Sequence, residues 1–341
     1  MNFELTDDQR SIQRTARDFL ASAYPPAEVR RLAYESERGF TDEGWAAICE
    51  LGWPALLVPE EHGGLALGVV ELAVVQEELG AALAPSPFLS TVAAAALIAD
   101  AGSEEQRARW LPALAAGEAR GAVATLADDD GWTAVPDADG ADVVVVRDGR
   151  RWAVAIATEA ESVEALDSTR RLWRVRAGGE LEPLPGDGAR ASDIVAVALA
   201  AESVGVARRA MDMAVEYAKE REQFGRPIGA YQAVSHACAQ MLLEVEGARS
   251  MALYAAWALD HEPESGPLAA SMAKAYASDA GWRVSAAALQ VHGGIGFTWE
   301  HDLHFFLKRA RTDGALFGSA RKHRDRVAEL AGLTSSAPAA V

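Results

Sequence analysis

Apolar residues recur at helical spacing through most of the first 121 residues. Thr6 and Gln9 form a capping-box pattern in front of the first apolar stripe, and Ser103 with Gln106 repeats it before the last one. Further helices are predicted over residues 45–51, 69–83 and 89–101. We therefore expect residues 1–121 to form an N-terminal α-helical domain.

From residue 122 the pattern changes to short runs rich in β-branched residues, separated by Asp and Gly clusters. Strands are predicted at residues 121–125, 142–147 and 151–156. Asp148-Gly149 lies between the last two runs and is a hairpin signal. The sequence thus predicts a small β domain over residues 122–188, which ends in the turn-forming Gly186-Asp187-Gly188.

Long helical patterns return after this turn, and Ser192 is predicted to cap the first of them. Helices are expected over residues 192–221, 231–259, 268–292 and 302–330. Four long helices with short connections favour an up-and-down bundle over residues 189–333. Residues 334–341 are rich in Ala, Ser and Pro and are predicted to form a frayed tail. The fold class is mainly α with a small β domain (α+β).

Composition limits the partners of the chain more than its fold. Of its 341 residues, 32 are basic and 50 acidic, and the net charge of −18 disfavours nucleic acid and anionic membranes as partners. Neither a secretory signal nor a membrane-spanning run is present, so a cytoplasmic location is expected. Cys49 and Cys238 define neither a disulfide framework nor a metal site, and we expect buried free thiols.

One candidate site is the run Arg221-Glu222-Gln223-Phe224-Gly225-Arg226-Pro227-Ile228, which joins two bundle helices. Gly225 permits a left-handed backbone, and Pro227 prevents continuation of the first helix. A cation, an amide and an aromatic ring within four positions can hold a phosphate and cover a flat apolar ligand. A charged helix end with one buried Phe gives the same pattern, so the local sequence leaves both interpretations open.

Three further runs carry a resemblance to a known family. They are Leu51-Gly52-Trp53, Val58-Pro59-Glu60-Glu61-His62-Gly63-Gly64 and Gln290-Val291-His292-Gly293-Gly294-Ile295-Gly296-Phe297. Together with the run from Arg221 to Ile228, in this order and spacing, they resemble the acyl-CoA dehydrogenase family of flavoproteins. The resemblance spans most of the chain and fails in the middle and near the C-terminal end. The assembly of the three predicted parts into one fold rests on it.

In that family, FAD lies between the β domain of one subunit and the helical bundle of a neighbour, so the resemblance implies a shared cofactor. It implies that Arg221 reaches the pyrophosphate and that Gln223 offers a polar contact. Near the adenosine, the implied contacts are Phe224 and Ile228, and the bundle side is completed by Gln290, Gly293 and Gly294. A diphosphate needs a fixed cation, and glycines let backbone N–H groups approach it closely. The alternative for each glycine is an ordinary helix stop.

The β side departs from the family pattern. The family's Thr-Glu-Pro and Gly-Ser-Asp runs and its tryptophan strand are missing, and residues 122–188 are too few for the full domain, so a shortened β domain is expected. Asp128-Asp129-Asp130-Gly131-Trp132 occupies the region of the flavin-binding run. Trp132 is either a remnant of that run or a packing residue, and packing is the interpretation that we favour.

The resemblance implies α,β-dehydrogenation of an acyl-CoA thioester, in which a carboxylate removes the α proton as the flavin takes the hydride. The usual base position aligns with Phe317, and the one used by some relatives aligns with Val195. Neither side chain can abstract a proton. Glu202 lies two turns after Val195 on the same helix face and is the candidate that is left. Its alternative role is that of a carboxylate satisfied by a neighbouring helix or by solvent.

Other acidic and histidine residues near the glycine run have simpler explanations. Glu300 and Asp302 are predicted to cap the last helix, whose first turn favours anions. His292, His301 and His304 are scattered across a turn without further ligands, so no metal site is expected.

One hypothesis explains both the incomplete β side and the missing base. The chain would be one half of a mixed assembly, similar to the smaller subunit of actinobacterial heterotetrameric acyl-CoA dehydrogenases that act on steroid side-chain thioesters. A larger homologous subunit would supply the isoalloxazine site and the base, and this chain would complete the adenine side. Two alternatives stay open: a homo-oligomeric flavoenzyme with Glu202 as a displaced base, and a non-catalytic scaffold subunit.

Overall fold

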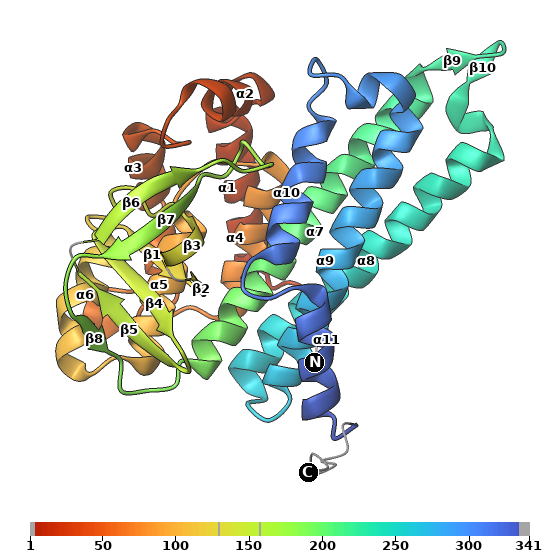
Figure 1. Ribbon diagram of the computed structural model, residues 1–341. Coiled ribbons are helices and arrows are strands. Elements are labelled where there is room, and N and C mark those ends of the chain that lie inside the picture. Colours follow the sequence, from red (N-terminus) through yellow and green to blue (C-terminus); the bar gives the residue numbers. More distant parts are fainter. Residues whose placement is uncertain (1–3, 129, 157, 334–341) are drawn as a thin grey trace, which may run out of the picture.

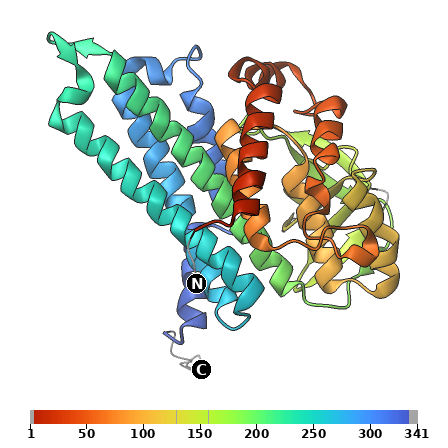
Figure 2. The same cartoon turned by 180° about the vertical axis from the view of Figure 1, so that it is seen from behind.

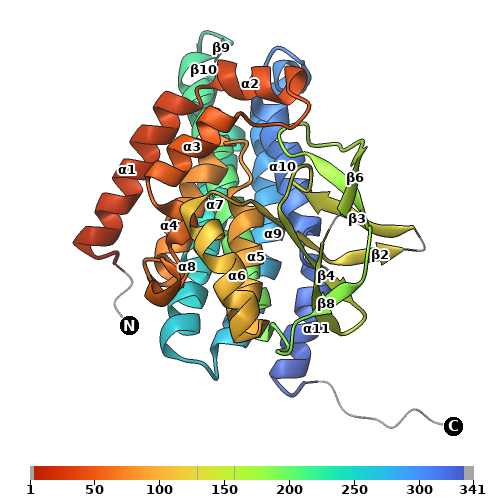
Figure 3. The same ribbon diagram turned by 90° about the vertical axis from the view of Figure 1, so that its left-hand side faces the viewer.

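The computed structural model describes residues 4–128, 130–156 and 158–333, and the predicted tail 334–341 lies outside them (Figure 1). Two small sheets lie at one side of a long helical bundle, and the N-terminal helices pack behind them (Figures 1 and 3). The prediction of a mainly helical chain with a small β part is confirmed. Within the described residues, no helix combines the length and the apolar character needed to cross a bilayer.

The N-terminal part contains six α-helices and two 3-10 turns among the described residues: α1 Asp7–Ala23, α2 Pro26–Glu35, α3 Asp42–Glu50, η1 Trp53–Ala55, η2 Glu60–His62, α4 Val69–Ala82, α5 Phe88–Ala101 and α6 Glu104–Ala116. Both predicted capping boxes are present. The Gln9 backbone N–H donates to Thr6 Oγ1 at 3.2 Å, and that of Gln106 donates to Ser103 Oγ at 3.2 Å. The periodicity analysis missed α2, a short helix with Pro26 in its first turn.

The middle part contains more strands than the three predicted runs: β1 Gly121–Ala124, β2 Leu126–Asp128, β3 Gly131–Pro136, β4 Val143–Asp148, β5 Arg151–Ala155, β6 Thr158–Val163, β7 Leu172–Ala177 and β8 Leu181–Pro183. They form two four-stranded sheets, ordered β1-β4-β5-β8 and β2-β3-β7-β6. Only the β1–β4 pair is parallel among the described strand pairs. The hairpin predicted at Asp148-Gly149 is confirmed, because Asp148 pairs with Arg151 and Gly149 has a φ of +57°.

Alternation along β4 explains how the sheets join the helices. Val144 and Val146 belong to a small core between the two sheets, whereas Val143 and Val145 belong to the main core shared with the helices. Both faces of this strand are therefore buried, which explains its unbroken run of valines.

The bundle comprises α7 Ala189–Glu220, α8 Gln232–His261, α9 Gly266–His292 and α10 Leu303–Ala315, followed by α11 Ala320–Leu330. The prediction of one last helix over residues 302–330 is wrong, because Phe317 and Gly318 have φ angles of +55° and +108° and break it. Ser192 does not cap α7, which begins three residues earlier, and its hydroxyl donates to the Gly188 carbonyl at 2.7 Å.

Helices α4 and α7 cross at close range, as the view from behind shows (Figure 2). A Cβ added to Gly205 on α7 would lie 1.9 Å from the Glu77 carbonyl oxygen, and one added to Gly80 on α4 would lie 2.3 Å from that of Glu202. Glycine at both positions is thus required by the approach of two backbones. This crossing fixes α7, and with it both candidate sites on that helix, against the N-terminal helices.

Candidate functional site

The run after α7 forms a small hairpin that projects from the end of the bundle (Figure 1). Strands β9 Glu222–Gln223 and β10 Arg226–Pro227 pair in antiparallel register, and η3 Ile228–Ala230 leads into α8. Phe224 and Gly225 form the two-residue loop of the hairpin. Their φ angles of +52° and +78° agree with a type I′ turn, which requires a positive φ at both positions. The Phe224 side chain is 94% exposed, so the alternative of a buried ring at an ordinary helix end does not hold.

The second run stops α9 and then turns back on itself. Gly293 follows the last residue of the helix with φ +62° and ψ −140°, a conformation that glycine tolerates best. The chain continues as η4 Gly293–Phe297. A Cβ added to Gly293 or Gly294 would meet nothing within 4 Å, so the space in front of both backbones is open. These two positions can therefore receive a ligand at close range.

The structure brings the two runs to the same end of the bundle (Figures 1 and 2). The rings of Tyr217 on α7 and His292 on α9 stack with their centroids 4.5 Å apart. Arg221 lies one turn beyond Tyr217, and Gln290 lies in the last turn of α9. Segments separated by about 70 positions in the sequence thus lie at the same end of the bundle.

The polar side chains of this surface are largely uncommitted. Arg221 is exposed, and its guanidinium makes no hydrogen bond or ion pair with another residue in the described part of the chain. Gln290 is also exposed, and Gln223 donates only to the neighbouring Glu222 carbonyl at 2.8 Å. Ile228 is half-buried. The set offers an unpaired cation, the exposed Gln290 amide and an exposed ring to a ligand.

None of the three cavities of about 430, 420 and 660 Å³ between the described residues includes a member of this set. The largest of these three lies at the other end of the bundle beside Trp257 and His261. Another, of about 430 Å³, lies between α1, α4, α7 and α10. A dinucleotide bound at the hairpin and the glycine run would therefore lie on an open surface of this chain.

A cleft of about 420 Å³ does lie between the second sheet and the bundle, beside the usual base position. Its walls are mostly apolar and include Leu126, Leu172 and Trp282. Its one lining carboxylate among the described residues, Asp279, forms an ion pair with Arg324 at 2.7 Å. Trp132 lies on β3, is packed against the core between the sheets, and donates its indole N–H to the Arg147 carbonyl at 3.0 Å, which agrees with a packing role.

Both base positions carry side chains without acid–base chemistry. Phe317 lies in the break between α10 and α11, is partly buried against the main core, and its carbonyl accepts from the His323 ring at 3.2 Å. Val195 lies on α7 and is 2% exposed. Neither position brings a carboxylate to the cleft.

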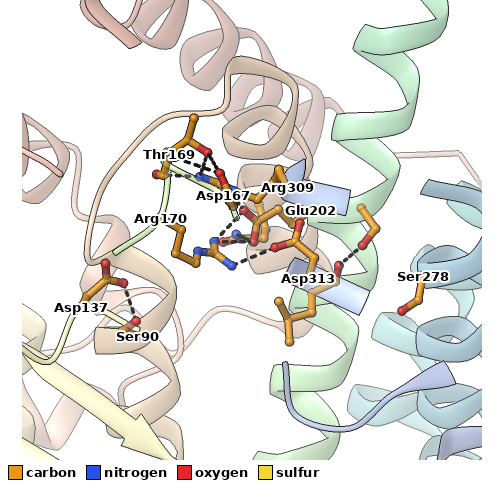
Figure 4. A network of polar contacts seen from close by, with 12 residues as sticks. Ser90, Asp137, Asp167, Thr169, Arg170, Glu202, Ser278, Arg309 and Asp313 are labelled. Atoms are coloured by element: carbon orange, nitrogen blue, oxygen red, sulfur yellow. Dashed lines mark hydrogen bonds and ion pairs between the residues drawn. The ribbon is translucent and has the colours of Figure 1, made fainter. Parts of the chain in front are cut away.

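Glu202 lies in a buried network of ion pairs (Figure 4). Arg170 donates to both of its carboxylate oxygens at 2.7 and 3.0 Å, and Arg309 donates to one of them at 2.8 Å. Gln76 on α4 donates to the other at 2.9 Å. The carboxylate is 1% exposed and has no free side facing a cavity. These contacts support the alternative role of Glu202 as a paired structural carboxylate.

The network extends beyond Glu202 in two directions. Arg170 also binds Asp313 at 2.8 Å, and Arg309 binds Asp167 at 2.8 Å. Lys274 on α9 donates to the Asp313 carbonyl oxygen at 2.7 Å. The sequence analysis missed these residues, because a buried Arg in a loop or an apolar helix has no signal in hydrophobic periodicity. Their pairing joins the loop before β7 to α4, α7, α9 and α10.

Burial shifts the pKa values of several side chains in this network. Burial alone would raise the pKa of Glu202, but the Arg170 and Arg309 guanidiniums together lower it below its usual value. Burial, and next the Glu202 carboxylate, raise the pKa of Asp313 to about 8. Burial also lowers the pKa of Lys274 to about 8. Glu202 thus stays ionised, and Asp313 keeps its proton near neutral pH.

Three predictions near the glycine run and the cysteines have outcomes in the structure. Asp302 precedes α10 but makes no capping hydrogen bond, because its carboxylate pairs with Arg30 on α2. Within the described residues, no group of His, Cys, Asp and Glu side chains could hold a metal ion. Cys49 and Cys238 are free thiols, but they are half-buried rather than buried.

Comparison with protein families gives two matches. Residues 6–118 match the family model described as "Acyl-CoA dehydrogenase, N-terminal domain", and residues 193–331 match "Acyl-CoA dehydrogenase, C-terminal domain". The segment between them contains the two small sheets.

The chain is also similar to individual acyl-CoA dehydrogenases in sequence and in structure. Acyl-CoA dehydrogenase IpdE2 of Mycobacterium tuberculosis is 39% identical over 318 residues, covering 93% of this chain and 95% of IpdE2. Acyl-CoA dehydrogenase FadE34 of the same organism is 34% identical over 96% of this chain, which matches 48% of FadE34. Among solved structures, the "Tcur3481-Tcur3483 steroid ACAD G363A variant" has a TM-score of 0.85 at 28% identity, covering 96% of this chain and 98% of that one. A chain of the ChsE4-ChsE5 complex from M. tuberculosis shares the fold at 24% identity and a TM-score of 0.87, covering 98% of this chain and 100% of that one.

Proposed function

The chain belongs to the acyl-CoA dehydrogenase family, and on that basis we propose that it completes the FAD site of a larger homologous partner subunit. The family's enzymes are oxidoreductases that use FAD, which accepts the hydride when bound. In the proposed assembly this chain supplies the adenine side, and the partner supplies the isoalloxazine site and the base. The substrate is an acyl-CoA thioester, and the structural neighbour whose title names a steroid ACAD favours a bulky steroid side chain as its acyl group.

One observation carries this proposal: the residues proposed to hold the dinucleotide lie at one end of the bundle, with an unpaired Arg221 guanidinium and open space in front of Gly293 and Gly294. Arg221 would pair with the diphosphate, and the open backbone at Gly294 would approach it from the other side, while the Gly293 N–H stays bonded to the Gln290 and Leu289 carbonyls. Phe224, with its ring at 94% exposure, would cover part of the adenosine. The residues present fit the adenine half of FAD, and that half needs a second chain to enclose it.

The positions from which a base would remove the α proton also support this assignment, in which the partner supplies the base. The positions of the family's two alternative bases hold Phe317 and Val195, and Glu202 is held by two guanidiniums. A base must reach the α proton with its carboxylate free to accept it, and no such group faces the cleft between the sheet and the bundle. The base is therefore assigned to the partner.

Relatives add support for pairing. FadE34 matches this chain over only 48% of its own length, so in that protein a segment of this kind is joined to about as much additional chain. The titles of two structural neighbours each name a pair of proteins.

The test is co-expression with the larger homologue, followed by flavin absorbance per chain. We expect bound FAD in the complex and none in this chain purified alone. Replacing Arg221 with Ala should lower the flavin content, because the diphosphate loses its cation. The matched control is Arg150→Ala, which removes an exposed, unpaired arginine from another hairpin loop.

Each competing function gives a distinct result. A chain that is yellow when purified alone, and loses activity on Glu202→Gln, would be a homo-oligomeric flavoenzyme. A complex whose flavin content and rate are the same with Arg221→Ala would reduce this chain to a scaffold. Either outcome refutes the shared site.

A further inference from the structure

We propose that the stacked rings of Tyr217 and His292 are a positioning pair, which sets the distance between the Arg221 cation and the Gly293-Gly294 backbone for the diphosphate of FAD. This inference rests on the proposed function above. In this proposal the two side chains contact neither FAD nor substrate. They set the distance between the two segments that do, which are called arms here: the hairpin that carries Arg221 and the run Gly293-Gly294.

The stack is the direct contact between the two arms. The ring centroids lie 4.5 Å apart with an angle of 20° between the planes, which is a parallel arrangement. His292 is buried, and its Nδ1 donates to the Ala288 carbonyl at 2.8 Å, so the ring has one orientation. The His301 ring lies 4.6 Å from it at 59°. Tyr217 therefore packs on a ring that is already fixed.

Each ring is joined to its arm through one or two backbone links. The Arg221 N–H donates to the Tyr217 carbonyl at 2.8 Å, and the Ile228 N–H donates to the Arg221 carbonyl at 2.8 Å. The position of the whole hairpin is thus set by the turn of α7 that carries Tyr217. On the other side, His292 is directly followed by Gly293 in the sequence. A shift of Tyr217 relative to His292 would move the cation relative to the glycine backbone.

Helix packing alone does not explain these rings. Along most of their length α7 and α9 bury small residues, mainly alanine, serine and glycine. A Cβ added to Gly281 on α9 would lie only 3.6 Å from the Ser203 side chain on α7. Only toward the end that carries the candidate site does an aromatic pair occupy this interface among the described ring contacts. The pair therefore sets the distance between α7 and α9 at the end of the bundle where the ligand is proposed to bind.

A ligand binds best to arms that are already at the distance that its groups require, because less ordering is then needed on binding. Without the stack, the last turn of α7 and the hairpin would have to be ordered on binding. An aromatic pair contributes a modest free energy, so we expect its loss to weaken FAD binding about three- to tenfold. Loss of the Arg221 cation itself should weaken binding more.

The experiment uses the complex with the larger homologue and measures dissociation constants by flavin fluorescence. Tyr217→Leu should weaken FAD binding, and Tyr217→Phe, which keeps the stack, should restore it. Because the pair acts on the diphosphate and adenosine half, binding of FMN should be the same in all three proteins. Trp257→Leu is the matched control, since it breaks a comparable stack with His261, whose rings lie 5.1 Å apart at 8°.

Two further measurements separate positioning from folding. Thermal unfolding of the complexes without FAD should give similar melting temperatures for Tyr217→Leu and the parent, since Tyr217 is only half-buried. His292→Leu provides a second way to remove the stack if the first variant is poorly folded. Parent-like FAD affinity in a folded Tyr217→Leu complex, together with weakened binding in Arg221→Ala, would refute the positioning role and leave the proposed function intact. Parent-like affinity in both would overturn the proposed function as well.

Discussion

Replacing Arg170 with Met tests whether the buried ion pairs hold this fold together. Arg170 is the one side chain among the described residues that binds both Glu202 and Asp313, at 2.7 and 2.8 Å. Without it, Glu202 keeps Arg309 and Gln76 as donors. Asp313 keeps none, because its Oδ1 loses the Arg170 contact and its Oδ2 has no partner to begin with.

Removing Arg170 leaves the protonated, buried Asp313 carboxyl without a hydrogen-bond donor, and a buried polar group without a partner costs about 1–3 kcal/mol. With an unfolding entropy of about 2.1 cal/mol/K per residue, the 341 residues correspond to ~0.7 kcal/mol per degree. Arg170→Met should therefore lower the melting temperature by about 1.5–4 °C.

Thermal unfolding at pH 7 followed by circular dichroism measures this effect. Arg150→Met is the control, because it removes an exposed arginine without a partner in the described part of the chain. The double variant Arg170→Met with Asp313→Leu should recover part of the loss, since the buried carboxyl without a partner is replaced by an apolar side chain of similar size. A loss below about 1 °C in the single variant, or no recovery in the double variant, would show that the network contributes little.

Two further predictions concern the pH dependence of stability and the helix crossing. The pKa of Asp313, about 8 when folded against 3.8 for the free side chain, means that the folded chain keeps a proton that the unfolded chain has lost. Stability should fall as the pH rises through this window, and Asp313→Asn should flatten the slope in urea titrations at pH 5 to pH 8; an unchanged slope would contradict the shifted pKa. Gly205→Ala should lower the free energy of unfolding by about 1–3 kcal/mol, because its Cβ would lie 1.9 Å from the Glu77 carbonyl oxygen. The control Gly281→Ala, whose nearest contact is 3.6 Å, should be neutral or stabilising, and equal losses in both would refute the close-crossing explanation.

The candidate cofactor surface could be predicted from the sequence to a large extent. The run at Arg221 carries its own turn chemistry in Phe224-Gly225, and Gly293 ends α9. Each run can be located from a few neighbouring residues. That both runs lie at the same end of the bundle followed only from the family resemblance. In the structure, the stacked rings of Tyr217 and His292 are the contact that holds the two runs near each other.

The roles of Glu202 and of the last helix could not be predicted in this way. Glu202 has helical spacing from Val195, but its chemistry depends on Arg170, 32 positions away, and Arg309, 107 positions away. The break at Phe317 lies inside a continuous helical pattern and requires a positive φ at a residue that normally avoids it. The pairing of Glu202 has no local cause in a short window of sequence. The break has a local signal in Gly318 and in Ser319, whose hydroxyl accepts from the Lys322 N–H at 3.3 Å and caps α11, but the continuous periodicity on both sides masked it.

The sequence by itself determined the features that are decided within a few residues: the capping boxes at Thr6 and Ser103, the Asp148-Gly149 hairpin, and the glycine stops. Hydrogen bonds to near neighbours and the φ angles open to each residue fix these elements before any packing occurs. The tertiary structure alone decided which charges are paired, which rings stack and which surface is left open. Those properties depend on contacts such as Arg170 with Asp313, 143 positions apart, and burial gives such contacts the strength to set the charge and orientation of a side chain.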